Sequence, residues 1–408
     1  MKIFTQLFVV LIFLQGGSLL AADTLVVSLH SIPDRIRKQN PDLAAARYRI
    51  KEALGRMHQS GRKSNPELEI GAKQGSDFRE RGISVGISQK FPITARLQLE
   101  KQLSLTQVKA AEQEIRDVER RLVADARELL IRTLASRQQR KLITQQKTIS
   151  MQLADFIGKA AEKGESSVLD AGQAKLEAIQ LENEIRQLKA EEVALTGKLK
   201  PLLGMSTSAL LHAGGKLPTL GTIKAANLNP NNRPDLKAAK LRTKAANKAA
   251  ELERAKRYDD IEVGISAELE RSEDAPDGYE NQGSIGFRVK IPLPLHNKNE
   301  GAIEEADAKK ARREKESQAL AQNIRHEAST AHKEMKEWIK LSHEITTNLL
   351  PLAEKQSKLT EQAYRNGQGD LQSTLRSREQ LLKLHSAKLK AQLNYHLAKN
   401  RYHAALAY

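Results

Sequence analysis

The side chains most able to do chemistry in this 408-residue chain are its ten histidines, and the stretch from residue 326 to 334 places two of them near glutamates. His326-Glu327 and His332-Lys333-Glu334 could offer imidazole and carboxylate groups to a metal ion. The two histidines are six residues apart, whereas a spacing of four places two imidazoles on one helical face. The pattern therefore favours a solvated helix face over a metal site. His296 follows an expected strand, where we expect a loop role.

Other signatures of catalysis are missing from the sequence. It contains no phosphate-binding loop or glycine-rich dinucleotide turn. It has no cysteine, which excludes disulfides, thiolate metal ligands and thiol catalysis. Glu268 and Glu270 are two apart on one face of an expected strand, which suits a wetted surface better than an acid–base pair. We therefore expect no enzyme, no cofactor and no metal site.

The chain is strongly basic, with 67 Lys and Arg against 50 Asp and Glu and a formal charge of +17. Such an excess can indicate nucleic acid, an anionic membrane surface or an acidic partner. Aromatic residues make up only 4%, and no nucleic-acid-binding motif is present. We therefore expect no nucleic-acid partner, and we interpret the charge as solvated helix surface that an acidic protein could complement.

The N-terminus carries the pattern of an export signal. Met1-Lys2 precedes an apolar run from Ile3 to Leu14, and small residues lead to Ala21-Ala22 before Asp23. This order predicts a secretory signal peptide over residues 1–22. An uncleaved membrane anchor is the alternative, but the alanines followed by Asp23 favour cleavage. No later segment approaches the ~18 consecutive apolar residues of a transmembrane helix, so we expect an exported chain without helical spans.

The chain contains one pattern twice. Three segments of the first half recur in order in the second half: Pro41-Asp-Leu43 as Pro234-Asp-Leu236, Leu68-Glu-Ile-Gly71 as Ile261-Glu-Val-Gly264, and Ser84-Val-Gly86 as Ser284-Ile-Gly286. Ordered matches of this kind indicate a duplication. The offset grows from 193 (234 minus 41) to 200 (284 minus 84), so we expect the second hairpin loop to be seven residues longer.

Each copy predicts a short helix, a strand hairpin, a very long helix and a return helix. The long segments are rich in strong helix formers, and Gly164 and Gly367 follow them as C-terminal glycines do. Pro351 predicts a kink or local break. The expected units are a signal peptide (1–22), a first repeat (23–204), an inter-repeat segment (205–232) and a second repeat (233–408). Within the first repeat we expect a helix at 41–63, a hairpin at 66–92, a long helix at 96–163 and a return helix at 167–202. Within the second repeat we expect a helix at 234–257, a hairpin at 259–292, a long helix at 298–366 and a return helix at 370–407.

The helix lengths predict how these units pack. At 1.5 Å per residue, a helix of about 68 residues is ~100 Å long. The two shorter helices of each copy together nearly match its long helix. We therefore expect them end to end beside it, which would make an even two-layer wall.

The hairpins alternate apolar and polar residues, for example over Ile261–Glu270. A solvated edge hairpin would alternate too, but strands of about 9–11 residues in an exported chain favour the outer membrane. Four strands cannot close a barrel, because the smallest have about eight, and each unpaired backbone group in lipid costs several kcal/mol. Several chains must therefore contribute strands to one barrel. Its water-filled lumen would be lined by Glu262, Glu268, Glu270 and Arg288.

This organisation resembles the TolC-type outer-membrane efflux family over essentially the whole mature chain. The most specific match is Tyr364-Arg-Asn-Gly367, followed by Leu371, Leu375 and Ala391-Gln-Leu-Asn-Tyr395, which is similar to the turn and return helix at the periplasmic tip. The resemblance implies a mainly α fold with a β-hairpin pair: a duplicated long-helix α-barrel and a trimeric 12-stranded transmembrane β-barrel, with four strands per chain. It places the protein in the outer membrane, extending into the periplasm.

The same resemblance implies partners. Family members are homotrimers in outer-membrane lipid that dock on a periplasmic adaptor (membrane fusion) protein and an inner-membrane pump, here expected to be of the RND type. The start of the second repeat, Arg233-Pro-Asp-Leu236, is most similar to the heavy-metal (CzcC-like) branch. Metal ions are therefore a candidate cargo.

The resemblance also implies a gate at the tunnel end. Asp170 and Tyr364 match members of a polar network that holds the family's tunnels closed, whereas Gly369 stands where a linking arginine is expected. Ser373 and Arg376 stand where some relatives carry a ring of carboxylates. Three copies would form an arginine ring if Arg376 faces the lumen. The alternative is that Arg376 faces a neighbouring helix or the adaptor.

The function predicted from the sequence is passive conduction of substrates to the exterior. The tunnel would open by outward movement of the tip helices around Gly164 and Gly367. The alternative is a periplasmic coiled-coil scaffold that never enters a membrane and whose strand hairpins project into water. The two differ in whether the protein fractionates with the outer membrane as an oligomer.

Overall fold

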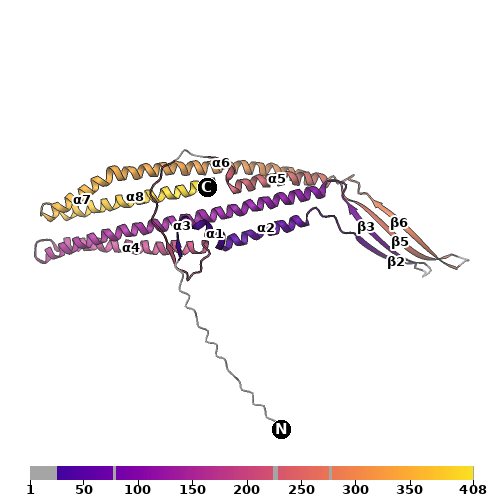
Figure 1. Cartoon of the computed structure of the whole chain (residues 1–408), viewed down its shortest axis with the longest axis horizontal. Helices are drawn as coiled ribbons and strands as arrows, with labels where there is room; N and C mark the ends of the chain where they lie inside the picture. Colours follow the sequence, from indigo (N-terminus) through magenta and orange to yellow (C-terminus); the bar gives the residue numbers. More distant parts are fainter. Residues whose placement is uncertain (1–24, 77–79, 224–227, 275–277, 408) are drawn as a thin grey trace, which may run out of the picture.

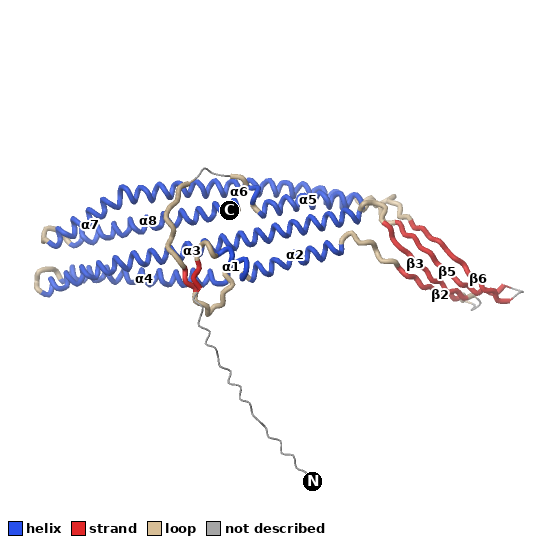
Figure 2. Tube along the Cα trace, viewed as in Figure 1, coloured by secondary structure: helices blue, strands red, loops and turns tan. Residues whose placement is uncertain are grey.

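Long helices form most of the molecule, and four strands extend from one end of it (Figures 1 and 2). The computed structural model describes residues 25–76, 80–223, 228–274 and 278–407. The expected signal peptide lies outside the described residues. Among the described residues, no helix contains a stretch long and apolar enough to cross a membrane.

The first half of the chain follows the expected order of elements. Its elements are β1 (Leu25–Val27), α1 (Ile32–Gln39), α2 (Pro41–Gln59), β2 (Glu67–Gln74), β3 (Arg81–Phe91), α3 (Arg96–Glu162) and α4 (Val168–Leu202). Helix α1 was not predicted from the sequence. Asn40 separates it from α2, and the Asn40 side chain accepts a hydrogen bond of 2.7 Å from the Leu43 N–H, which caps α2.

The second half repeats the order. After β4 (Leu211–Ala213) and a 3₁₀ turn (Pro230–Asn232) come α5 (Pro234–Ala255), β5 (Ile261–Asp274), β6 (Gly278–Lys290), α6 (Glu300–Glu344), a π-helical segment η2 (Ile345–Leu349), α7 (Leu350–Arg365) and α8 (Leu371–Leu406). The local break expected at Pro351 is thus confirmed. Proline lacks an N–H and its ring clashes with the carbonyl four residues earlier, and the wider π turn accommodates both.

The short helices end earlier than the sequence predicted. Helix α2 ends at Gln59 rather than at residue 63. Gly61 has a φ of +68°, and a Cβ there would lie 2.4 Å from the Leu97 carbonyl oxygen, so only glycine fits where the chain turns past α3. Helix α5 likewise ends at Ala255 rather than at residue 257.

The extra residues of the second hairpin lengthen its strands. Strands β5 and β6 have 14 and 13 residues, against 8 and 11 in β2 and β3. The expectation of a longer loop was therefore wrong. Strand pairing continues as far as Asp274 and Gly278, although the residues added beyond Leu269 are mostly polar.

The four long strands form one antiparallel sheet in the order β2-β3-β5-β6. Strands β3 and β5 join the two hairpins, from Arg81 opposite Arg271 to Phe91 opposite Ile261. Strands β2 and β6 are therefore the two edges. A separate parallel pair, β1 and β4, ties the start of the described chain to the inter-repeat linker.

The helices form the expected two-layer wall. Figure 1 shows α4 and α2 end to end beside α3, and α8 and α5 end to end beside α6. The main core lies where α1, α2, α3 and α4 meet the linker and includes Ile32, Leu130 and Leu199. The linker crosses the wall (Figure 2). It is held there by the Tyr395 hydroxyl, which donates to the Gly221 carbonyl at 3.3 Å, and by His396 at 2.7 Å from the Pro218 carbonyl.

Candidate functional site

The sheet has one polar face and one apolar face. Directly paired residues share a side of a sheet, as do residues two apart on a strand. The register therefore places on one face Glu67, Glu69, Gly71 and Lys73 of β2; Gly82, Ser84, Gly86, Ser88 and Lys90 of β3; Glu262, Gly264, Ser266, Glu268 and Glu270 of β5; and Gln282, Ser284, Gly286, Arg288 and Lys290 of β6. The four predicted lumen residues all belong to this face.

Small residues occupy the middle of the polar face. A Cβ on Gly86 or Gly264 would lie 3.3 Å from the Cβ of a serine on the neighbouring strand. Over these two glycines, Arg288 of β6 reaches toward Glu69 of β2, with 3.9 Å between Nη1 and Oε2. The small residues thus keep this surface shallow and let charged groups interact across two intervening strands.

Ion pairs on the polar face link neighbouring strands. Lys73 lies 2.5 Å from Glu268, and Lys90 lies 2.9 Å from Glu67. Among the described residues, Glu262 and Glu270 form no ion pair within 4 Å. The face is therefore charged and wettable along its length, which suits contact with water.

The other face of the sheet is apolar and uncovered in the single chain. Ile285 is 82% exposed and Phe287 is 73% exposed. Other exposed members are Leu68, Ile70, Ile83, Val85, Ile87, Ile265, Leu269 and Val289. A soluble monomer rarely exposes a contiguous apolar patch of this kind, which marks a membrane or protein contact.

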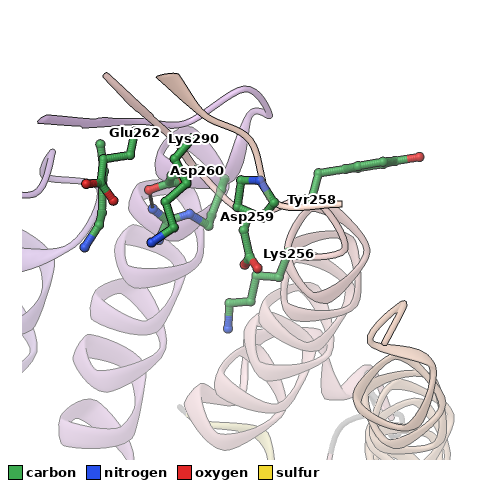
Figure 3. Close-up of a pocket in the computed structure, with 9 residues that line it drawn as sticks. Lys256, Tyr258, Asp259, Asp260, Glu262 and Lys290 are labelled. Carbon is green, nitrogen blue, oxygen red and sulfur yellow. Dashed lines mark hydrogen bonds and ion pairs between the residues drawn. The ribbon is translucent and has the colours of Figure 1, made fainter. Parts of the chain in front are cut away.

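Charged groups connect the strands to the helices at the base of the sheet. A cavity of about 460 Å³ lies there, lined by basic groups and by Asp259, Asp260 and Glu262 (Figure 3). Arg96, at the start of α3, lies 2.7 Å from Asp260 just before β5. Tyr258 points away from the other labelled side chains. The Arg96–Asp260 pair therefore fixes the sheet to the first long helix.

The tips of both helical hairpins turn at glycine, as the sequence predicted. Gly164 and Gly367 have φ angles of +74° and +71°. At each tip the residue after the glycine donates back to the helix, from Glu165 N to the Ala160 carbonyl and from Gln368 N to the Ala363 carbonyl, both at 2.8 Å. These are Schellman-type ends, which need a left-handed residue at this position.

Asp170 and Tyr364, the two predicted members of the closing network, do not contact each other through a hydrogen bond within one chain. Asp170 is half-buried in the first turn of α4, and Tyr364 packs against an apolar cluster at the tip that includes Leu153, Ile157 and Leu371. No hydrogen bond between described residues joins the two side chains. A role for this pair in closing the tunnel therefore requires contacts between copies, and it stays a prediction.

The other predicted gate residues have distinct local settings. A Cβ on Gly369 would lie 3.2 Å from the Ala363 Cβ, which gives a steric reason for glycine where an arginine was expected. Ser373 belongs to the N-cap of α8: its N–H and its hydroxyl both donate to Asp370 at 2.7 Å. These two bonds hold the pKa of the Asp370 carboxyl below its usual value. Arg376 is exposed beside a cavity of about 440 Å³ between α4 and α8.

A buried ion-pair cluster near the tips was not found from the sequence. Arg378 is 3% exposed and lies 2.7 Å from Glu361, which also pairs with Arg365 at 2.9 Å. Across the same cavity, Glu177 of α4 has a buried Oε2 without a hydrogen-bond partner, as has Nη1 of Arg378. The i, i+4 spacing of Glu361 and Arg365 was the one visible signal.

The pKa values of the two glutamates shift in opposite directions. Burial raises the pKa of Glu177, opposed by the positive charge of Arg378. Burial would also raise the pKa of Glu361, but the hydrogen bonds and charges of Arg378 and Arg365 outweigh it and lower that pKa. Glu361 therefore forms the ion pair with Arg378, whereas Glu177 lies beside this pair without forming an ion pair of its own with Arg378.

The histidines differ in burial. His326 is exposed, as the sequence predicted. His332 is buried, with its ring 5.6 Å from that of Tyr402, so a solvated face was the wrong expectation for it. The contact depends on α8 packing against α6, which spacing alone does not reveal. Among the described residues, no three His, Cys, Asp or Glu side chains gather as a metal site would need.

The Arg233-Pro-Asp-Leu236 motif has a structural role. Arg233 is buried and lies 3.0 Å from Asp235 and 2.5 Å from Glu327 of α6, which fixes the start of α5 against that helix. The motif is therefore explained by packing, and it gives no independent support to a metal cargo.

Solved structures share this fold. CusC aligns over 94% of this chain and 93% of its own, with a TM-score of 0.79 and 17% identity. VceC of Vibrio cholerae aligns over 93% and 95%, with a TM-score of 0.74 and 16% identity. The CmeC outer membrane channel of Campylobacter jejuni aligns over 93% and 85%, with a TM-score of 0.75 and 13% identity. At the sequence level, no curated protein matches significantly.

The sequence itself carries the signature of one family in both halves. The family model described as "Outer membrane efflux protein" matches residues 32–204 and 227–407, which together cover most of the chain. The two matched segments coincide with the two runs of helix, hairpin, long helix and return helix. The chain therefore belongs to the outer membrane efflux protein family.

Proposed function

We propose that three copies of this chain join edge to edge into one barrel and one helical tunnel, which passively conducts substrates across the outer membrane. The observation that carries the proposal is the four-stranded sheet with two free edges. Strand β6 runs opposite to β2, so β6 of one copy can pair with β2 of the next in the antiparallel sense used throughout the sheet. Such closure satisfies the edge groups that lipid would leave unpaired.

Three copies give twelve strands from four per chain, the number that the family resemblance implies. Two copies would give eight, a barrel whose interior side chains fill. The glycines and serines of the polar face support an open lumen. The apolar face, with Ile285 and Phe287, would then contact lipid.

The helical end supports a gated tunnel. Both hairpins end at a glycine turn around one apolar cluster, so their tips can close together and move outward as units. From the family resemblance we propose that a periplasmic adaptor and an inner-membrane pump of the RND type complete the export route. The pump, a different chain, would select the cargo; metal ions stay one candidate through the family resemblance alone, since the packing of Arg233 accounts for the motif that suggested them.

Disulfide cross-linking tests the edge pairing, because the chain has no cysteine of its own. Cysteine replaces Ile70 on β2 and, in separate variants, Ile285, Phe287 or Val289 on β6. Oxidation in outer membranes should yield covalent trimers from at least one pair, and the Ile70→Cys single variant should give monomers. If no pair cross-links and the protein is recovered as a soluble monomer, the channel is excluded and the coiled-coil scaffold becomes the better account.

A further inference from the structure

An arginine-lined cavity lies in the middle of the helical body, away from both the sheet and the tips. It has a volume of about 530 Å³ and lies between α1, α3, the start of α5 and the end of α8. Its charged lining consists of four arginines, Arg37, Arg116, Arg120 and Arg127, and one carboxylate, Glu119. The cavity wall is therefore strongly positive.

Two of these arginines are already neutralised. Arg37 donates to Glu119 through Nε at 3.0 Å and through Nη2 at 2.8 Å. Arg120 donates to Asp117 through Nε and Nη2, and its Nη1 donates to the Ala404 carbonyl at 2.8 Å, near the end of α8. These contacts fix the two side chains and use the cavity's one carboxylate.

The other two arginines have no such partner. Among the described residues, no carboxylate forms an ion pair with Arg116 or Arg127. Arg127 is half-buried, and burial alone lowers its pKa. The pKa of His403 is lowered by burial, and then by the charges of Lys399 and Arg127. The site therefore contains positive charge that is removed from water without a counter-charge, which is costly.

The arginines also form a line. Arg116, Arg120 and Arg127 stand at i, i+4 and i+11 on α3, which places them on one face of the helix. At 1.5 Å per residue the line is ~16 Å long. One end is an exposed guanidinium and the other a half-buried one. An extended ligand with acidic groups at its ends could contact both guanidinium groups.

We propose that this cavity binds an extended organic or inorganic anion with two or more carboxylate or phosphate groups, held by Arg127 at one end and Arg116 at the other. Guanidinium groups bind both acid types through paired N–H donors. The inference does not depend on conduction, because the site is complete within one chain.

Binding of two probes to the purified full-length protein in detergent tests the proposal. A linear polyphosphate and a hexaglutamate peptide, each long enough to span ~16 Å, represent the phosphate and carboxylate classes in calorimetric titrations at fixed ionic strength, with acetate as the single-charge comparison. We expect saturable binding of at least one probe and little of acetate. Arg127→Gln should weaken that binding at least about tenfold, since a hydrogen bond to a charged group contributes that much. Arg132→Gln, on the same helix but outside this cavity, should leave it within about twofold of wild type.

A stability readout separates loss of the site from loss of the fold. Without the probe, Arg127→Gln should melt at the same temperature as wild type or higher, because an unpaired half-buried charge is removed. At the same probe concentration, wild type and Arg132→Gln should gain similar stability, and Arg127→Gln should gain clearly less. Absence of saturable binding at millimolar probe overturns the proposal, as does equal weakening in Arg132→Gln. Neither result would affect the cross-linking test of the channel.

Discussion

Gly164 and Gly367 end the helices for reasons of backbone conformation alone. Each has a positive φ, and a Cβ at either would meet no atom within 4 Å. The sequence predicted both turns because glycine is the residue that reaches the left-handed region without strain. It could not predict Arg378, whose burial depends on Glu361 of α7 and on the approach of α4.

Replacing a tip glycine by alanine tests whether glycine is needed for its backbone conformation, because a Cβ at this position would meet no steric obstacle. Gly367→Ala should lower the free energy of unfolding by about 1–2 kcal/mol, the cost of a left-handed non-glycine residue. Gly172→Ala is the matched control, because Gly172 lies within α4, has open space and has no positive φ. That change should instead stabilise by about 0.5–1 kcal/mol. Thermal unfolding measures both, and shifts of the same sign would contradict the role of backbone conformation.

The glutamates beside Arg378 should titrate with opposite effects on stability. A carboxyl whose pKa is raised by folding destabilises the folded state when ionised, so Glu177→Gln should raise the melting temperature at neutral pH. That gain should vanish as the pH falls through the raised pKa toward the ordinary value of about 4.3.

Glu361 should behave in the opposite way. A carboxyl whose pKa is lowered by folding stabilises the folded state at every pH above its ordinary pKa. Glu361→Gln should therefore lower the melting temperature at neutral pH and lose its effect only in stronger acid.

Melting curves of the two variants between neutral and acid pH check both signs. Glutamine keeps the shape of glutamate, so packing changes little. A destabilised Glu177→Gln at neutral pH would show that Arg378 depends on Glu177 as well as on Glu361.

Asp170 tests whether the tip is closed by contacts between copies. Because Asp170 has no hydrogen bond to Tyr364 within the described chain, Asp170→Ala should lower the stability of the dissociated chain only by the about 0.3–1 kcal/mol that a carboxylate in the first turn of a helix contributes. In assembled channels it should raise the closed-state current in single-channel recordings. Asp155→Ala, an exposed carboxylate of α3 near the same tip, should leave that current unchanged. An unaltered current in Asp170→Ala would remove Asp170 from the gate.

At the scale of elements, the helices and turns could be predicted because their signals are local. Runs of helix formers, two glycines and Pro351 set most boundaries to within a few residues. The two features that the sequence did not predict depend on contacts with residues far away in the chain. Helix α1 is stabilised by the burial of Ile32 and Ile36 in the main core, and the extended second hairpin by pairing along β5 and β6. No pattern within either segment shows what it will pack against.

At the scale of the whole molecule, the sheet and the helical body differ in how much apolar surface they expose. The helices bury their apolar side chains against one another, whereas the sheet leaves one whole face uncovered. Edge closure removes the unpaired backbone groups but not this apolar face. A lipid environment is therefore required for the sheet even after the copies assemble.

A lysine on either face of β6 tests that requirement in the assembled protein. Phe287→Lys would put a charge in lipid, at a cost of about 2–4 kcal/mol near the midplane of the membrane, and three copies would multiply it. We expect it to lose membrane insertion and trimer formation, as measured by outer-membrane fractionation and gel mobility without boiling. Ser284→Lys, three residues earlier on the opposite face, should insert and assemble but change the conductance. If Phe287→Lys inserted as well as Ser284→Lys, the apolar face could not be the lipid contact, and the barrel would have to be oriented or assembled in another way.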